Sequence, residues 1–156
     1  MSAADPNRLT AYHEAGHAVI ALAEGRAIQE VSILPGPQRL GHCQVKKGAG
    51  RKLKDSLETD LLILLAGIAA EVRLTGRYNL RGAAQDLQMA QKLASLRAPN
   101  ERQGQRLLER TLAKVEHLLA DDATWRAVEA VAAELLVSQR ISGRAARHFY
   151  ELAMAK

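Results

Sequence analysis

Two histidines and a glutamate near the N-terminus have the types and spacing needed to hold a metal ion and to use it. His13 and His17 are four residues apart, so on a helix both imidazoles project from one face. Two such nitrogens can reach a single Zn²⁺ at about 2.0–2.1 Å. Glu14 lies beside them and can take a proton from a water molecule. The His-Glu-x-x-His pattern therefore predicts zinc-dependent hydrolysis with Glu14 as general base.

The alternative is a pair of histidines on a solvated helix face, with Glu14 as an ordinary surface charge. The local context favours a metal site, because small residues separate the histidines and an apolar run follows them. Gly16 inside a helix costs about 1 kcal/mol relative to alanine. We therefore expect another segment of the chain to pack closely against this glycine.

A catalytic zinc ion usually has three protein ligands and a water molecule, so a third ligand must come from elsewhere in the chain. Several residues have suitable chemistry, and their spacing alone does not choose among them. These candidates are Glu71, Asp86, His42, His117 and His148.

The elements that position the two histidines begin with a helix. Asp5 as N-cap and Pro6 in the first turn predict a helix that runs to about Glu24 and stops at Gly25. Two short strands follow, residues 30–34 and 40–45. The sequence Pro-Gly-Pro between them predicts a hairpin or a two-strand ribbon.

The rest of the chain has helical patterning. A helix over residues 54–74 is apolar on nearly every face, which predicts the central buried element. After a loop over 75–82, a third helix is expected from about residue 83 to 96. Residues 101–156 predict two or three amphipathic helices, with Ser142 as a cap. One of these helices has an apolar stripe that is expected to face the core, made of Val128, Val131, Ala132, Leu135 and Leu136. His117 and His148 are expected on the surface.

Composition indicates one globular domain over residues 1–156, with the metal site in 1–97 and a helical region over 101–156. Of the residues, 47% are hydrophobic and 25% are charged. Cys43 is the sole cysteine, which excludes an intrachain disulfide and is typical of a reducing compartment. The longest apolar stretch, residues 61–72, is too short to span a bilayer, and no signal peptide precedes it. We expect a cytoplasmic protein with no membrane partner.

The formal charge of +5 does not make nucleic acid an expected partner. Lysines and arginines are mixed with acidic residues, and no aromatic residues alternate with them to stack on bases. The densest basic cluster, residues 46–54, falls in a glycine-containing loop and is expected to solvate that loop. It could still steer acidic partners.

The segment Ala-Tyr-His-Glu-Ala-Gly-His-Ala-Val, residues 11–19, resembles the protease domain of the FtsH-type ATP-dependent zinc metalloproteases. The likeness continues through residues 31–35 and 40–41, then through Leu-Ala-Gly at 65–67 and Ala-Ala-Glu at 69–71. It ends in Gly-Ala-Ala-Gln-Asp-Leu at 82–87. These blocks cover about two thirds of the chain in the family's order, which implies a mainly α, zincin-like fold with a small two- or three-strand β element near the N-terminus.

The resemblance assigns roles to two further carboxylates. The aspartate of the Gly-Ala-x-x-Asp-Leu segment is the family's third zinc ligand and corresponds to Asp86. The glutamate of the Ala-Ala-Glu segment corresponds to Glu71 and implies a hydrogen bond to a ligand histidine. In the family the strand that contains His42 pairs with extended substrate, a mode that uses backbone groups.

The departures from the family limit what the chain is expected to do. Ile68 replaces a common arginine, Val72 replaces a second glutamate, and the C-terminal third matches only in being helical. The sequence contains no phosphate-binding loop, so we expect ATP-independent cleavage of peptide bonds in unfolded or extended polypeptides. A separate unfoldase or adaptor and a homo-oligomer are candidate partners. The alternative is a catalytically weak zinc-binding interaction or adaptor module derived from the peptidase fold.

Overall fold

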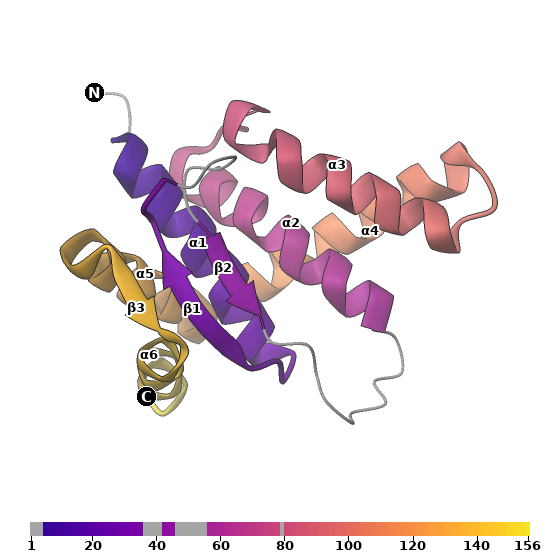
Figure 1. The fold of residues 1–156 in the computed structure, drawn as a ribbon. Coiled ribbons are helices and arrows are strands. Elements are labelled where there is room, and N and C mark those ends of the chain that lie inside the picture. Colours follow the sequence, from indigo (N-terminus) through magenta and orange to yellow (C-terminus); the bar gives the residue numbers. More distant parts are fainter. Residues whose placement is uncertain (1–4, 36–41, 46–55, 79) are drawn as a thin grey trace.

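The helix that carries both histidines forms as its capping residues predict. The computed structural model describes residues 5–35, 42–45, 56–78 and 80–156 (Figure 1). Helix α1 spans Pro6–Ala23, and the side chain of Asp5 accepts a hydrogen bond from the N–H of Asn7 at 3.1 Å. Its continuous buried run, residues 11–21, includes both histidines. Gly25 follows with φ of 81°, a conformation that suits glycine and ends the helix.

A three-stranded antiparallel sheet follows α1, and its third strand comes from the far end of the chain. Strands β1 (Ile28–Ser32), β2 (His42–Val45) and β3 (Arg140–Ser142) lie in the order β2-β1-β3. Val31 in the middle strand lies opposite Cys43 on one side and Ile141 on the other. The predicted ribbon is confirmed, although β1 begins two residues early. The predicted turn falls mostly on residues 36–41, which lie outside the described part of the chain, as does the predicted loop over 46–52.

The two or three helices predicted in residues 101–156 are confirmed, and the short strand β3, which was not predicted, separates the last two. Three residues are too few to produce a recognisable alternation of apolar and polar side chains. The strand is held instead by backbone pairing with β1, continued by a hydrogen bond from the N–H of Ile33 to the carbonyl of Gln139 at 2.9 Å.

Helix α2 spans Ser56–Thr75 and α3 spans Leu80–Arg97. The predicted central helix is confirmed, and its first two predicted residues lie outside the described ranges. The predicted loop over 75–82 is too long, because α3 begins at Leu80. Gly82 therefore falls in the first helical turn, where a glycine does not indicate a loop.

Three helices complete the fold, each begun by a side-chain cap. They are α4 (Glu101–Ala120), α5 (Asp122–Ser138) and α6 (Gly143–Met154), and Ser142 caps α6 as predicted. Of the stripe predicted on α5, four side chains are fully buried, but Leu136 is 39% exposed. Leu136 follows the last buried position, Leu135, and is turned about 100° from it.

Helix α2 lies at the centre and packs against α1, α3 and α4 (Figure 1). The sheet, α5 and α6 lie on one side of this centre, and α3 and α4 lie on the other. A β-carbon built on Gly16 of α1 would come within 2.6 Å of the carbonyl oxygen of Ala66 and 2.8 Å of the β-carbon of Ala70. The close approach predicted at this glycine is therefore confirmed, and α2 is the segment that makes it. None of the helices in the described ranges is long and apolar enough to cross a membrane.

Candidate metal centre

Side chains from α1, α2 and α3 converge where α1 packs against α2. His13 and His17 are buried on the face of α1 that meets α2, at 7% and 8% exposure. Asp86 reaches them from α3, and its Oδ2 lies 2.7 Å from Nε2 of His13 and 3.0 Å from Nε2 of His17. The three potential ligand atoms lie within 4.8 Å of one another. The structure thus brings these three predicted residues together.

The other ring nitrogen of each histidine is held by α2. Nδ1–H of His13 donates to Oε2 of Glu71 at 2.6 Å, and Nδ1–H of His17 donates to the carbonyl oxygen of Ile63 at 2.6 Å. These bonds fix the orientation of both rings and leave both Nε2 atoms directed to the same point. Metal-bound histidines are commonly supported in this way, by a carboxylate or a backbone carbonyl.

Gly67 lies between the two supporting groups, four residues from each along α2. A β-carbon at this position would lie 2.6 Å from Nε2 of His13 and 2.6 Å from Nε2 of His17. The missing side chain therefore leaves the two Nε2 atoms unobstructed at the point where they meet. The site offers two imidazole nitrogens and one carboxylate oxygen, which is a ligand set that suits a catalytic zinc ion. The space beside Gly67 leaves room for the ion.

The surroundings of the histidines favour positive charge. Burial lowers the pKa of His13, but hydrogen bonds to Asp86 and Glu71 and the charge of Glu14 outweigh it and raise this pKa to about 10. Burial also lowers the pKa of His17, and the hydrogen bond to Asp86 leads the effects that raise it above its usual value. Burial raises the pKa of Asp86, yet its bonds to the two histidines hold that pKa far below the usual range. The same negative surroundings would also favour the binding of a divalent cation.

Glu14 is buried beside the two histidines, at 6% exposure. It is one position after His13 on α1, so its side chain is turned about 100° from the histidine and does not share its direction. Its negative charge raises the pKa of His13 and His17. It also adds to the effect of burial in raising the pKa of the half-buried Cys43 on β2.

Two of the other candidate ligands, both in the described part of the chain, do not join this cluster. His117 and His148 are exposed on α4 and α6, as predicted. His42 pairs with Ser32 at the start of β2, and its side chain is outside the described set. Reasoning from the sequence missed the roles of Ile63 and Gly67. Ile63, Gly67 and Glu71 follow one another at intervals of four residues, which is also the spacing of His13 and His17 on α1. Residues at this spacing share one face of a helix, so the pattern was a usable signal that these positions of α2 face the two histidines.

Comparison with known proteins identifies the family to which this fold belongs. Residues 1–98 match the family model of Peptidase family M41. The match covers more than half of the 156 residues, and the chain belongs to this family.

Several proteins that are similar to this chain are named as ATP-dependent zinc metalloproteases. The chain is 41% identical over 95 residues to the ATP-dependent zinc metalloprotease FtsH of Methylibium petroleiphilum, an overlap of 58% of this chain and 15% of the relative. It is 40% identical over 91 residues to the FtsH protein of Syntrophotalea carbinolica, covering 56% of this chain and 14% of that protein. It is 35% identical over 95 residues to the ATP-dependent zinc metalloprotease YME1 homolog of Caenorhabditis elegans, covering 58% and 13%. The matched segment thus spans about one seventh of each relative.

Proposed function

We propose that this chain is a zinc metalloendopeptidase that hydrolyses peptide bonds in unfolded or extended polypeptides. The observation that carries the proposal is the meeting of Nε2 of His13, Nε2 of His17 and Oδ2 of Asp86 within 4.8 Å. Membership of Peptidase family M41 and the zinc metalloprotease names of the relatives support the choice of metal and reaction.

In this proposal His13, His17 and Asp86 hold the metal, and Glu14 acts as general base. Zn²⁺ supplies Lewis acidity, which acidifies a water molecule and polarises the scissile carbonyl. Glu14 takes the proton from that water as its oxygen bonds to the carbonyl carbon. The same carboxyl then gives the proton to the leaving nitrogen as the C–N bond breaks. Glu71 and the carbonyl of Ile63 keep the two imidazoles oriented throughout.

An extended substrate suits the sheet beside this site. Among the described strands, β2 has a neighbour on one side only, because the order is β2-β1-β3. A free strand edge can pair with an extended peptide through backbone groups, which favours unfolded polypeptides over folded domains. Helix α1, which carries Glu14, packs against β2, so a peptide paired with this strand would lie beside the helix that bears the base.

The relatives are named as ATP-dependent, whereas we propose that the isolated chain cleaves peptides without ATP. Delivery of folded substrates would then fall to a separate unfoldase or adaptor. A homo-oligomer is part of the same proposal, and a measurement of mass in solution tests it.

The decisive experiment measures zinc content per chain and cleavage of casein for the wild type and for Glu14→Gln. The expected result is one zinc in both proteins and cleavage by the wild type alone, because the amide cannot accept the proton. Full activity in Glu14→Gln refutes the assigned base.

The alternative is a catalytically weak zinc-binding interaction module. It is favoured by one observation, that the family match ends at residue 98 and the last three helices lie outside it. Zinc in both proteins with no cleavage by either, with or without ATP, would support this alternative.

A further inference from the structure

Helix α4 carries its charges in two separate strips. Arg102, Arg106, Arg110 and Lys114 follow one another at intervals of four residues, and all four are exposed. At 100° per residue they occupy a sector of about 120° on the helix surface. We call these four residues the cationic strip. No carboxylate among the described residues forms an ion pair with any of them.

The glutamates of α4 lie along a different edge of the helix. Glu109 and Glu116 have no lysine or arginine four residues away in either direction, and Glu101 has none four residues further along α4. A helix whose charged side chains serve only to keep it in contact with water is stabilised when opposite charges alternate at this spacing. On α4 no glutamate stands four residues from a cation of the strip, and the four cationic side chains are exposed.

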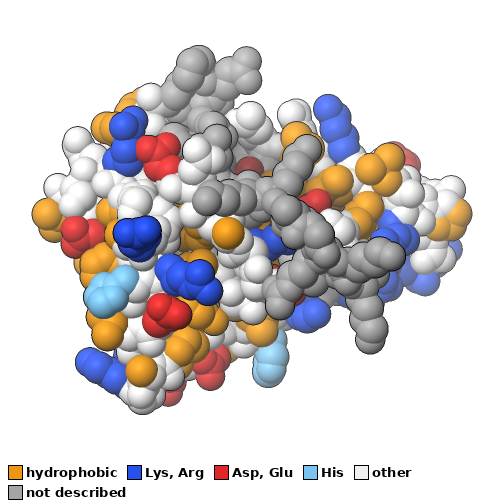
Figure 2. All heavy atoms as spheres, turned by 60° about the horizontal axis from the view of Figure 1, so that its bottom comes forward, with side chains coloured by type: hydrophobic (Ala, Val, Ile, Leu, Met, Phe, Trp, Pro, Cys, Tyr) orange, Lys and Arg blue, Asp and Glu red, His pale blue; other side chains and the backbone are white. Residues whose placement is uncertain are grey.

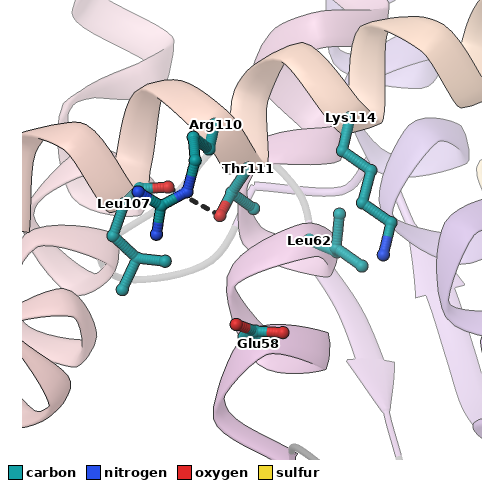
Figure 3. A pocket seen from close by; sticks show the side chains of 6 residues that line it. All are labelled: Glu58, Leu62, Leu107, Arg110, Thr111 and Lys114. Carbon is teal, nitrogen blue, oxygen red and sulfur yellow. Dashed lines mark hydrogen bonds between the residues drawn. The ribbon is translucent and has the colours of Figure 1, made fainter.

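The cationic strip borders a groove of about 140 Å³ between α2 and α4 (Figure 3). Leu62 of α2 and Leu107 of α4 give the groove an apolar floor. Thr111 also lines it, and its hydroxyl donates to the carbonyl of Leu107 at 2.8 Å, so this polar group is already satisfied. Arg110 and Lys114 stand at the rim, and Glu58 lies across from them (Figure 3).

The groove is separate from the metal centre. Leu62 and Glu58 precede Gly67 by five and nine residues, so their side chains point roughly 140–180° away from the histidines around α2. The right-hand end of Figure 2, which corresponds to the α3–α4 end in Figure 1, also carries several lysine and arginine side chains. A ligand could therefore occupy the groove while the metal centre is at work.

We propose that the groove and the cationic strip bind an acidic segment of a partner protein, anchored by one apolar side chain. The four unpaired cations match carboxylates, and the apolar floor matches an inserted leucine, methionine or phenylalanine. The groove volume is comparable with that of cavities that hold a single benzene ring. Nucleic acid fits less well, because α4 contains no tyrosine, phenylalanine or tryptophan for base stacking.

The test uses the whole chain and a fluorescein-labelled peptide of repeating Glu-Glu-Leu-Glu units, followed by fluorescence anisotropy. The groove variant is Arg110→Glu with Lys114→Glu. The matched control is Arg126→Glu with Arg144→Glu, which changes the formal charge equally at exposed positions on α5 and α6. Two further probes are the same peptide with serine in place of leucine and a single-stranded DNA of equal length.

The proposal requires that the groove variant bind the peptide at least about tenfold more weakly than the control variant, because rim charges are reversed only in the former. The serine peptide must also bind the wild type more weakly, because the anchor is missing. Zinc content should be the same in both variants, since the metal centre is on the opposite side of α2. Absence of peptide binding, equal loss in the two variants, or tighter binding of DNA than of peptide would each overturn the proposal.

Discussion

Nδ1–H of His13 donates a 2.6 Å hydrogen bond to Glu71, which ties a potential metal ligand on α1 to the neighbouring helix. Both partners are buried, with side-chain exposures of 9% and 4%. The bond holds the ring so that the opposite nitrogen faces Asp86. The carboxylate also makes the imidazole a stronger donor to a cation.

Replacement of Glu71 should weaken zinc binding and leave the ligand set intact. In Glu71→Gln the amide oxygen can still accept from His13, but the negative charge is lost. We expect the dissociation constant for zinc to rise about 10- to 100-fold. Competition with a chromophoric zinc chelator measures the change. An unaltered dissociation constant would show that this contact has no part in metal binding.

A methyl group at Gly67 should abolish tight zinc binding. The new β-carbon would lie 2.6 Å from both Nε2 atoms, so at least one imidazole must move. We expect Gly67→Ala to raise the zinc dissociation constant by about 100-fold or more, the upper end of effects seen on losing a supporting group.

Gly104→Ala is the matched control for this substitution. Its β-carbon would meet only the β-carbon of Ala98 at 3.8 Å, an ordinary contact. This variant should bind zinc normally and gain up to about 1 kcal/mol of stability from helix propensity. Equal zinc affinity in the two alanine variants would refute the role given to Gly67.

Gly16 should be needed for stability, because it lets α1 and α2 approach each other. In Gly16→Ala the β-carbon would lie 2.6 Å from a backbone oxygen of Ala66, which cannot move away as a side chain can. We expect the free energy of unfolding to fall by about 1–3 kcal/mol, the usual effect of overpacking. Urea denaturation followed by circular dichroism measures it. A variant as stable as the wild type would mean that the two helices separate without cost.

Zinc binding at neutral pH should release protons. The pKa of His13 in the metal-free chain is raised to about 10, so this ring carries an extra proton at pH 7, and the pKa of His17 is raised as well. Zinc must displace the proton from His13, and its apparent affinity should therefore increase as pH rises toward that pKa. Calorimetric titration in buffers of different ionisation enthalpy should report release of at least about one proton. A binding heat that is the same in every buffer would contradict this account.

Local signals in the sequence predicted the elements around the site well. The cap at Asp5 and the break at Gly25 defined α1, and the apolar character of residues 61–70 marked α2 as central. The strand β3 could not be found in this way, because its pairing with β1 joins residues that are distant in sequence. The end of the α5 stripe was misassigned at Leu136, where the helix turns out of the core.

The candidate site was predictable only in part from the residues themselves. The spacing of His13 and His17 on a helix gave their common direction without further information. Asp86 could not be preferred over four other candidates by spacing, and its selection depended on the resemblance to a family. The support from Ile63 is a backbone carbonyl, which no residue type reveals, and it required the packing of α1 on α2.

The place of β3 in the sheet has a consequence for how the protein folds while it is being synthesised. Strand β1 follows α1 directly, but its second neighbour is made of residues 140–142. As the chain leaves the ribosome, α1, β1 and α2 emerge long before the strand that closes the sheet beside them. The side chains of the candidate metal centre all lie between residues 13 and 86, so they leave the ribosome before the strand that completes the sheet, and the centre and the sheet become complete at different times.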